Sequence, residues 1–170
     1  MVNLESLEDL FVHKLNMLRD TESVIIDALP KFIDAAHSEE LKEGFQQHLR
    51  QSQQQLARLA EVIDNLGYST VDVPCKAMRA IVEEGEEVVN SPGDPDVKDA
   101  ALIAAAQSVE HYEIASYGTV RTFARQLGYD EAADLLQETL NQEGDTDKKL
   151  TRLAEGSLFT SGINEEAARK

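Results

Sequence analysis

Apolar residues recur every three or four positions along four long segments of the chain, which is the spacing of one face of an α-helix. The intervals predict helices over residues 5–36, 38–66, 95–127 and 131–154. The residues that fill these segments are mostly Ala, Leu, Glu, Gln and Lys, which are good helix formers. Pro30 lies inside the first segment and is expected to bend that helix near its end. The pattern therefore predicts an all-α fold.

The connections between these segments predict how the helices are joined. Ser38 is placed to cap the second helix, and Asp94 precedes Pro95 at the first helical position of the third. The first and second helices, like the third and fourth, are separated by only a few residues, so each pair should be an antiparallel hairpin. Residues 67–94 form a longer crossover with a short helical run of its own. This topology is that of a ferritin-like four-helix bundle with a short fifth helix.

The length of the chain suits one domain. A chain of 170 residues can bury its own core, and the whole of residues 1–170 is assigned to a single domain. Residues 155–170 show no sustained period and are expected to form a loosely held tail.

Polar residues interrupt the apolar face of each predicted helix near its middle. In the second helix the interruption runs from His48 to Gln55. In the third helix it contains two acids of the stretch SVEHYEIASYG, whereas His111 points to nearly the opposite side. The acids that interrupt the other three helices are Glu22, Glu110, Glu113, Glu143 and Asp147. Because residues equidistant from a hairpin turn face one another, the four interruptions should converge on one layer.

A layer of five acids needs a source of positive charge. Two carboxylates about 4 Å apart repel by roughly 4 kcal/mol at an effective dielectric constant near 20. Arg19, one turn before Glu22, is the basic side chain best placed to offset this charge. A bound cation is the less costly solution, and carboxylates with a nearby imidazole suit iron or manganese. The predicted ligands are Glu22, His48, Glu110, Glu113, Glu143 and Asp147.

A second interpretation needs no metal. A buried hydrogen-bond network could join Arg19, His48, Gln55 and Tyr117 to the acids, with some of the carboxyl groups protonated. The choice between the two interpretations stays open at the level of the sequence.

Charge and motifs exclude several other functions. The chain has 32 acidic and 16 basic residues, a formal net charge of −16, which disfavours binding to nucleic acid or to an anionic membrane. The first twenty residues contain neither a signal peptide nor a transmembrane span, so a cytoplasmic location is expected. Cys75 is the single cysteine and has no partner for a disulfide or a zinc motif. P-loop, GxGxxG, GxSxG and HExxH motifs are absent.

Five segments carry a resemblance to a known family. They are LEDLFVHKL at 7–15, ALPKF at 28–32, the helix with His48, Gln55 and Leu59, DAALIAAAQSVEHYEIASYG at 99–118, and EAADLLQETLNQEGDTDKKL at 131–150. Through them the chain resembles the YciE/YciF family of bacterial ferritin-like stress-response proteins, largely described as of unknown function. The resemblance implies a ferritin-like fold, a homodimer and, by analogy with rubrerythrin and related di-iron proteins, a metal site.

The chain departs from the di-iron pattern on two helices. Ferritin-like di-iron proteins carry Glu-x-x-His on two helices, whereas here the second helix lacks the glutamate and the fourth lacks the histidine. The family resembled tends to have a glutamate where this chain has Gln51, so the second helix offers His48, Gln51 and Gln55. One metal ion, or two held asymmetrically, are both compatible with this set.

Two functions follow as hypotheses. The first is a stress-response protein that holds iron or manganese at the centre of the bundle, with redox activity toward a small-molecule oxidant as an option. The second is a metal-free, dimeric structural or interaction module with a buried polar network and no turnover. Neither the metal nor a substrate is identified by the residues alone.

Overall fold

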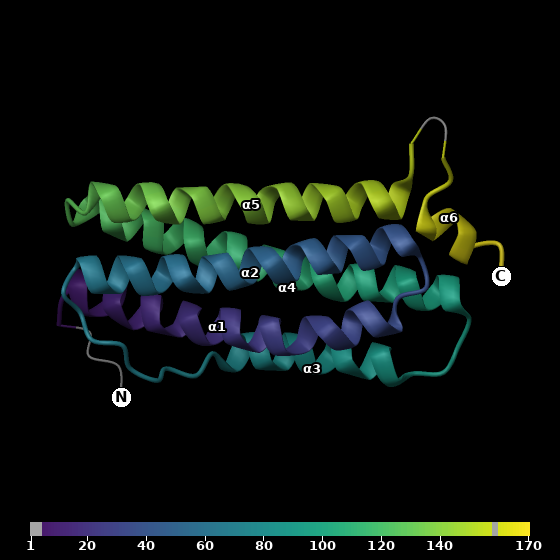
Figure 1. Ribbon diagram of the computed structural model, residues 1–170, viewed down its shortest axis with the longest axis horizontal. Helices are drawn as coiled ribbons and strands as arrows, with labels where there is room; N and C mark the ends of the chain where they lie inside the picture. Colours follow the sequence, from purple (N-terminus) through teal and green to yellow (C-terminus); the bar gives the residue numbers. More distant parts are fainter. Residues whose placement is uncertain (1–4, 158–159) are drawn as a thin grey trace.

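The fold is an all-α bundle. The computed structural model describes residues 5–157 and 160–170 (Figure 1). Its long helices are α1 (Leu7–Ala35), α2 (Glu39–Asn65), α4 (Pro95–Gln126) and α5 (Asp130–Glu155), and its short helices are α3 (Lys76–Asn90) and α6 (Ile163–Ala167). The predicted fold class is confirmed. None of the described helices is long and apolar enough to cross a membrane.

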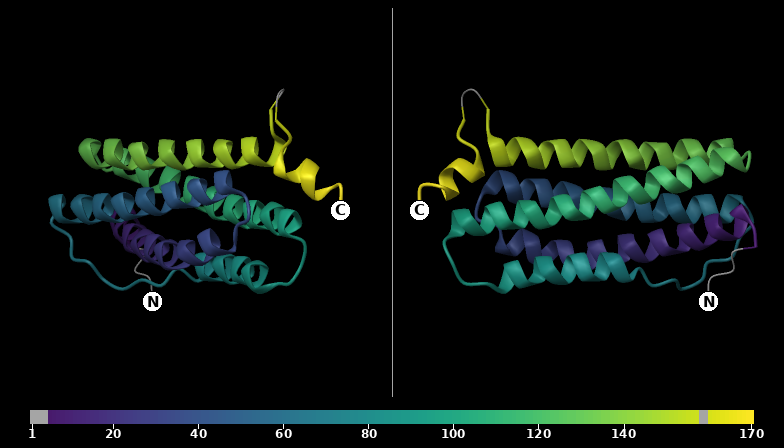
Figure 2. Two further views of the ribbon diagram at one scale, coloured as in Figure 1. Left: turned by 45° about the vertical axis from the view of Figure 1, so that its right-hand side comes forward. Right: turned by 180° about the vertical axis from the view of Figure 1, so that it is seen from behind.

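The helices form two antiparallel hairpins joined by one crossover. The helices α1 and α2 pack together as one hairpin, and α4 and α5 as the other. Between the hairpins, α1 contacts α4 and α2 contacts α5. The crossover returns along the outside of the bundle, and its helix α3 packs against α1 and α4 (Figure 2). This long return lets α4 start at the same end of the bundle as α2.

Side-chain caps mark the predicted helix starts. The Ser38 hydroxyl accepts a hydrogen bond from the Leu41 amide, and Asp94 accepts one from the Asp96 amide at 2.9 Å. Pro30 does not end α1, which continues to Ala35. The capping residues in the sequence therefore indicated where α2 and α4 begin.

The C-terminal segment differs from the expectation of a loosely held tail. Its residues 163–167 form helix α6, which packs against α4 and α5 and buries Ile163. Lys170 Nζ lies 2.9 Å from a carboxylate oxygen of Asp96. A five-residue helix has too few positions to show a hydrophobic period, so the pattern gave no sign of it. Residues 158 and 159 of this tail lie outside the described residues.

The apolar core is divided into two clusters along the bundle. The first cluster contains Phe32, Phe45 and Leu102 and lies at the end where α1 turns into α2 and where α3 covers the bundle. The second cluster contains Phe11 and Tyr117 and lies at the opposite end. Along every long helix, the residues of the first cluster and those of the second are separated by an interval of polar side chains.

A buried aspartate joins the two hairpins near one end. Asp99 of α4 is 2% exposed and accepts hydrogen bonds from the amides of His37 and Ser38, both at 2.7 Å. These amides belong to the turn between α1 and α2. Asp99 therefore fixes the first hairpin against the second through charge-assisted hydrogen bonds.

We expect Asp99→Ala to lower the free energy of unfolding by about 2–3 kcal/mol, because two backbone donors lose their acceptor. Asp99→Asn keeps one carbonyl oxygen as an acceptor and should lose less. Denaturation in urea, followed by circular dichroism, measures both variants. Equal midpoints for Asp99→Ala and the parent chain would contradict a stabilising role of this carboxylate.

Candidate metal centre

Apart from the threonines, seven buried polar side chains of the described residues occupy the level between the two apolar clusters. We call this set the polar layer, and each member is at most 3% exposed. Its members are Glu22, His48, Ser52, Gln55, Glu110, Glu113 and Glu143. They come from all four long helices, because each helix carries its polar interruption at the same level of the bundle.

Four members of the polar layer come close enough to share a cation. One ligand atom from each of His48, Glu110, Glu113 and Glu143 lies within 4.8 Å of the others. His48 Nδ1 is 3.1 Å from Glu110 Oε1, and His48 Nε2 is 3.8 Å from Glu113 Oε2. We call these four residues the ligand cluster. They lie on three helices, with α4 contributing two carboxylates one turn apart.

The ligand cluster has many polar atoms without a hydrogen-bond partner. Among the described residues, both carboxylate oxygens of Glu110 and of Glu113, Oε2 of Glu143 and Nε2 of His48 are buried without one. Buried polar groups are normally satisfied, and an unpaired buried charge is costly. The donor set therefore fits a cation, which carboxylates and an imidazole can bind directly.

Two neutral side chains orient carboxylates at the edge of this group. The Tyr117 hydroxyl donates a hydrogen bond to Glu22 Oε1, and the Gln55 amide donates one to Glu143 Oε1. In both acids the second oxygen, Oε2, is buried without a partner. One oxygen is thus held by the protein while the other stays available, which is how residues around a metal site commonly orient its ligands.

Burial governs the ionisation of the layer. Burial raises the pKa of Glu22, Glu110 and Glu113 well above the ordinary value, and the neighbouring carboxylates, Glu143 among them, raise it further. Burial lowers the pKa of His48, and the charge of Glu143 opposes this only in part. Without a cation, burial therefore shifts these groups toward their neutral forms, and a cation has to displace the protons that the acids hold.

Glu22 lies in the layer but outside the ligand cluster. Its side chain is fully buried, and the charges of Glu113 and Glu143 act on its pKa. Arg19, expected to help offset the charge of Glu22, makes no ion pair with it among the described residues, and its Nε is buried without a hydrogen-bond partner. The acids of the layer therefore receive no charge compensation from this arginine.

Asp147 is the predicted ligand that the structure places elsewhere. Its side chain is 21% exposed, its Oδ1 accepts a hydrogen bond from Gln107 at 3.1 Å, and the same oxygen lies 3.3 Å from His111 Nε2. Four residues turn a helix by about 400°, so Asp147 is rotated roughly 40° from Glu143. That rotation turns the Asp147 side chain toward the edge of α4. His111 lies at this edge and is exposed, as the sequence predicted.

The fold and the layer define the chain as a four-helix-bundle protein with one crossover and a candidate metal centre between its hairpins. The chain belongs to the DUF892 family, described as a domain of unknown function, whose family model matches residues 6–168. It is 42% identical over 170 residues to protein YciF of Escherichia coli (strain K12), and the match covers 99% of each chain. The resemblance seen in the sequence is thereby confirmed.

Solved structures agree with this assignment. The crystal structure of the E. coli stress protein YciF matches with a TM-score of 0.86 and 44% identity, over 88% of this chain and 95% of that one. YcfI of Rhodopseudomonas palustris, for which a structural role has been suggested, matches with a TM-score of 0.86 and 38% identity, over 89% and 97%. A Xanthomonas campestris protein shares the fold at 22% identity and a TM-score of 0.67, over 86% and 88%.

Proposed function

We propose that the chain is a metal-binding protein that holds one or two iron or manganese ions in the ligand cluster, with Glu22 beside it. The proposal rests on one observation above all. Four buried residues place ligand atoms within 4.8 Å of one another, and most of their polar atoms have no hydrogen-bond partner. No lysine or arginine among the described residues forms an ion pair with these acids.

The donor types favour iron or manganese. Carboxylate oxygens with one imidazole suit these ions, whereas thiolate-preferring metals have no ligand here. Cys75, the chain's single cysteine, contacts the Tyr112 hydroxyl at 3.0 Å and is not a member of the ligand cluster. When bound, such an ion would supply one-electron redox chemistry. The chain itself supplies burial, the donors Tyr117 and Gln55, and a neutral histidine.

The negative charge of the polar layer is relevant to how many metal ions the ligand cluster can hold. Ionised Glu22, Glu110, Glu113 and Glu143 would together carry four negative charges, which two divalent cations balance. A single divalent cation leaves two of the four negative charges uncompensated. Protons can neutralise these two, because burial raises the pKa of acids in the layer. Two ions at high metal concentration and one at low concentration are therefore both consistent with the residues present.

Metal content tests the proposal directly. We expect protein loaded with Fe(II) or Mn(II) without oxygen, then desalted, to retain one to two ions per chain by elemental mass spectrometry. The double variant Glu110→Gln, Glu113→Gln should retain less than about a tenth as much, because a neutral amide is a far weaker ligand. A parent chain that retains no more metal than this variant would exclude a metal centre.

Two further variants make this measurement specific. Asp147→Asn should retain the parent's metal content, because Asp147 lies outside the ligand cluster. A loss of metal in this variant would instead make Asp147 a ligand. Asp145→Asn changes the same charge on an exposed side chain, and it controls for the general attraction of cations to an acidic surface.

A metal-free structural role is the second candidate. The role suggested for YcfI favours it, as do the hydrogen bonds that Tyr117 and Gln55 donate to two of the acids. In this role the acids would have to share protons with one another, Glu110 with Glu143 and Glu113 with Glu22. E. coli YciF is described as a stress protein. We therefore propose that the metal centre functions in the response to oxidative or general stress. We also propose that the protein is a cytoplasmic homodimer.

A further inference from the structure

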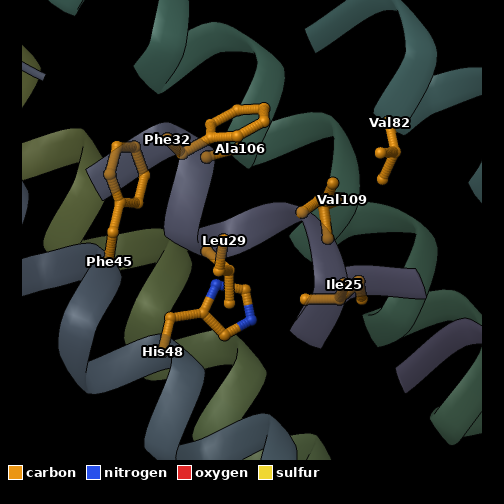
Figure 3. A pocket seen from close by; sticks show the side chains of 9 residues that line it. Ile25, Leu29, Phe32, Phe45, His48, Val82, Ala106 and Val109 are labelled. Carbon is orange, nitrogen blue, oxygen red and sulfur yellow. The ribbon is translucent and has the colours of Figure 1, made fainter. Parts of the chain in front are cut away.

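A small apolar pocket lies beside the histidine of the ligand cluster. It has a volume of about 20 Å³. Eight of its nine lining side chains are apolar, and they come from α1, α2, α3 and α4. Figure 3 shows the His48 ring among them, with Leu29 beside it. His48 is therefore the one polar side chain that this pocket shares with the ligand cluster.

The lining selects the kind of molecule that can occupy the pocket. A cavity needs roughly 10–15 Å³ to hold a water molecule, and a buried water needs two to four polar partners. The pocket is large enough, but His48 alone cannot supply those partners. Enclosed apolar cavities of proteins stay dry and take up gases such as xenon, and this pocket, which is only partly enclosed, offers the same kind of apolar lining. A cation or an anion would lose its hydration without compensation there.

The position of the pocket connects it to the candidate metal centre. His48 Nδ1 lies 3.1 Å from Glu110, and Val109, which lines the pocket, precedes Glu110 on α4. We infer that the pocket binds a small uncharged apolar molecule of the size of dioxygen and holds it on the His48 side of the ligand cluster. Its connection to a metal rests on the proposed function, but the binding of an apolar molecule does not.

Xenon binding to the metal-free protein tests the pocket itself. We expect the methyl resonances of Ile25, Leu29 and Val109 to shift with xenon pressure and to saturate. These residues line the pocket, whereas Val120 is buried in the other apolar cluster and should show no such shift. Methyl shifts that stay absent, or that grow linearly at every methyl group, would overturn the inference.

Variants that fill the pocket and variants that enlarge it should change xenon binding in opposite directions. Ala106→Val fills the pocket and should weaken xenon binding at least tenfold, whereas Val109→Ala enlarges it and should strengthen binding severalfold. Val120→Ala removes the same two methyl groups from the same helix in the other cluster, and the response of Ile25 and Leu29 should not change. Equal xenon affinity in Ala106→Val, Val109→Ala and the parent would contradict a site at this position.

Metal content, measured on the same preparations, separates this inference from the proposed function. Ala106→Val should retain the parent's metal content, because its side chain supplies no ligand. Metal without saturable xenon shifts would overturn the pocket and leave the metal centre intact. Xenon binding without metal would support the apolar site and overturn its connection to a metal. With both present, Ala106→Val should also slow the reaction of the Fe(II)-loaded protein with dioxygen.

Discussion

Glu113→Gln is expected to make the metal-free protein more stable at neutral pH and to weaken its metal binding. Glu113 is fully buried, and neither of its carboxylate oxygens has a hydrogen-bond partner among the described residues. Burial raises the pKa of Glu113, so at neutral pH the folded state carries a free-energy cost for protonating this carboxyl group or burying its charge, and a neutral amide of similar size has no such cost. The same change removes a ligand oxygen from the cluster. Stability and metal affinity should therefore change in opposite directions.

Denaturation in urea, with chelator and with added Mn(II), measures both effects. With chelator, Glu113→Gln should unfold at a higher urea concentration than the parent. With Mn(II) the order should reverse, since a ligand that binds only the folded state stabilises the parent more. Asp145→Asn, which alters an exposed carboxylate, should stay within about 0.5 kcal/mol of the parent in both conditions. A chelated Glu113→Gln that is less stable than the parent would favour the metal-free hydrogen-bond network.

The metal-free protein is expected to lose stability as the pH rises above the ordinary carboxyl range. Burial raises the pKa of Glu22, Glu110 and Glu113 in the folded state above 4.5, the value for an unperturbed glutamate. Between the two values the folded chain holds protons that the unfolded chain has released, so unfolding becomes more favourable as pH increases. Each pKa unit of difference corresponds to about 1.4 kcal/mol per group.

His48 acts in the opposite direction over part of this range. Burial lowers its pKa below 6.5, so the unfolded chain binds the additional proton there, and stability from this group rises toward pH 6.5. Burial also lowers the pKa of His13, which acts in the same direction as His48. The three buried carboxyl groups outweigh these two imidazoles below pH 6.5, and above it the carboxyl contribution dominates. The net slope of unfolding free energy against pH should therefore be negative from about pH 5 up to the folded-state pKa values.

Denaturation at a series of pH values, with chelator, tests this slope. Added Mn(II) should flatten or invert it, because metal binding competes with protons for the same carboxylates. Glu113→Gln should show a shallower slope than the parent, because one of the titrating groups is gone. A metal-free stability that rises steadily between pH 5 and 8 would mean that the buried acids are held ionised by the protein.

Helix positions and the polar layer were accessible from the sequence because both depend on periodicity. The interruptions at Glu22, Glu113 and Glu143 each lie one or two helical turns from apolar core positions, and a straight helix preserves that order. Asp147 shows what the periodicity of one helix does not resolve. A four-residue step keeps a side chain on roughly the same face, but the remaining rotation of about 40° separates a buried position from the edge of the helix.

The part played by α2 could not be predicted from residue types. The sequence left open whether Gln51 and Gln55 replace acidic ligands. In the structure Gln55 donates a hydrogen bond to Glu143, so its amide orients a carboxylate. The apolar pocket was also invisible in the sequence, because its volume depends on how side chains from four helices fit together. Periodicity describes one helix at a time, whereas these features arise between helices.

The division of the core into two apolar clusters has a consequence for cooperativity. Each cluster draws side chains from all four long helices, and the polar layer between them contributes little apolar contact. We therefore expect the metal-free bundle to behave as two half-bundles that share continuous helices but loosen separately, as cooperative subunits of a fold do. An ion bound by residues of α2, α4 and α5 in the polar layer would hold these helices together at the boundary between the two halves. Metal occupancy would then decide whether the protein unfolds as one unit or as two.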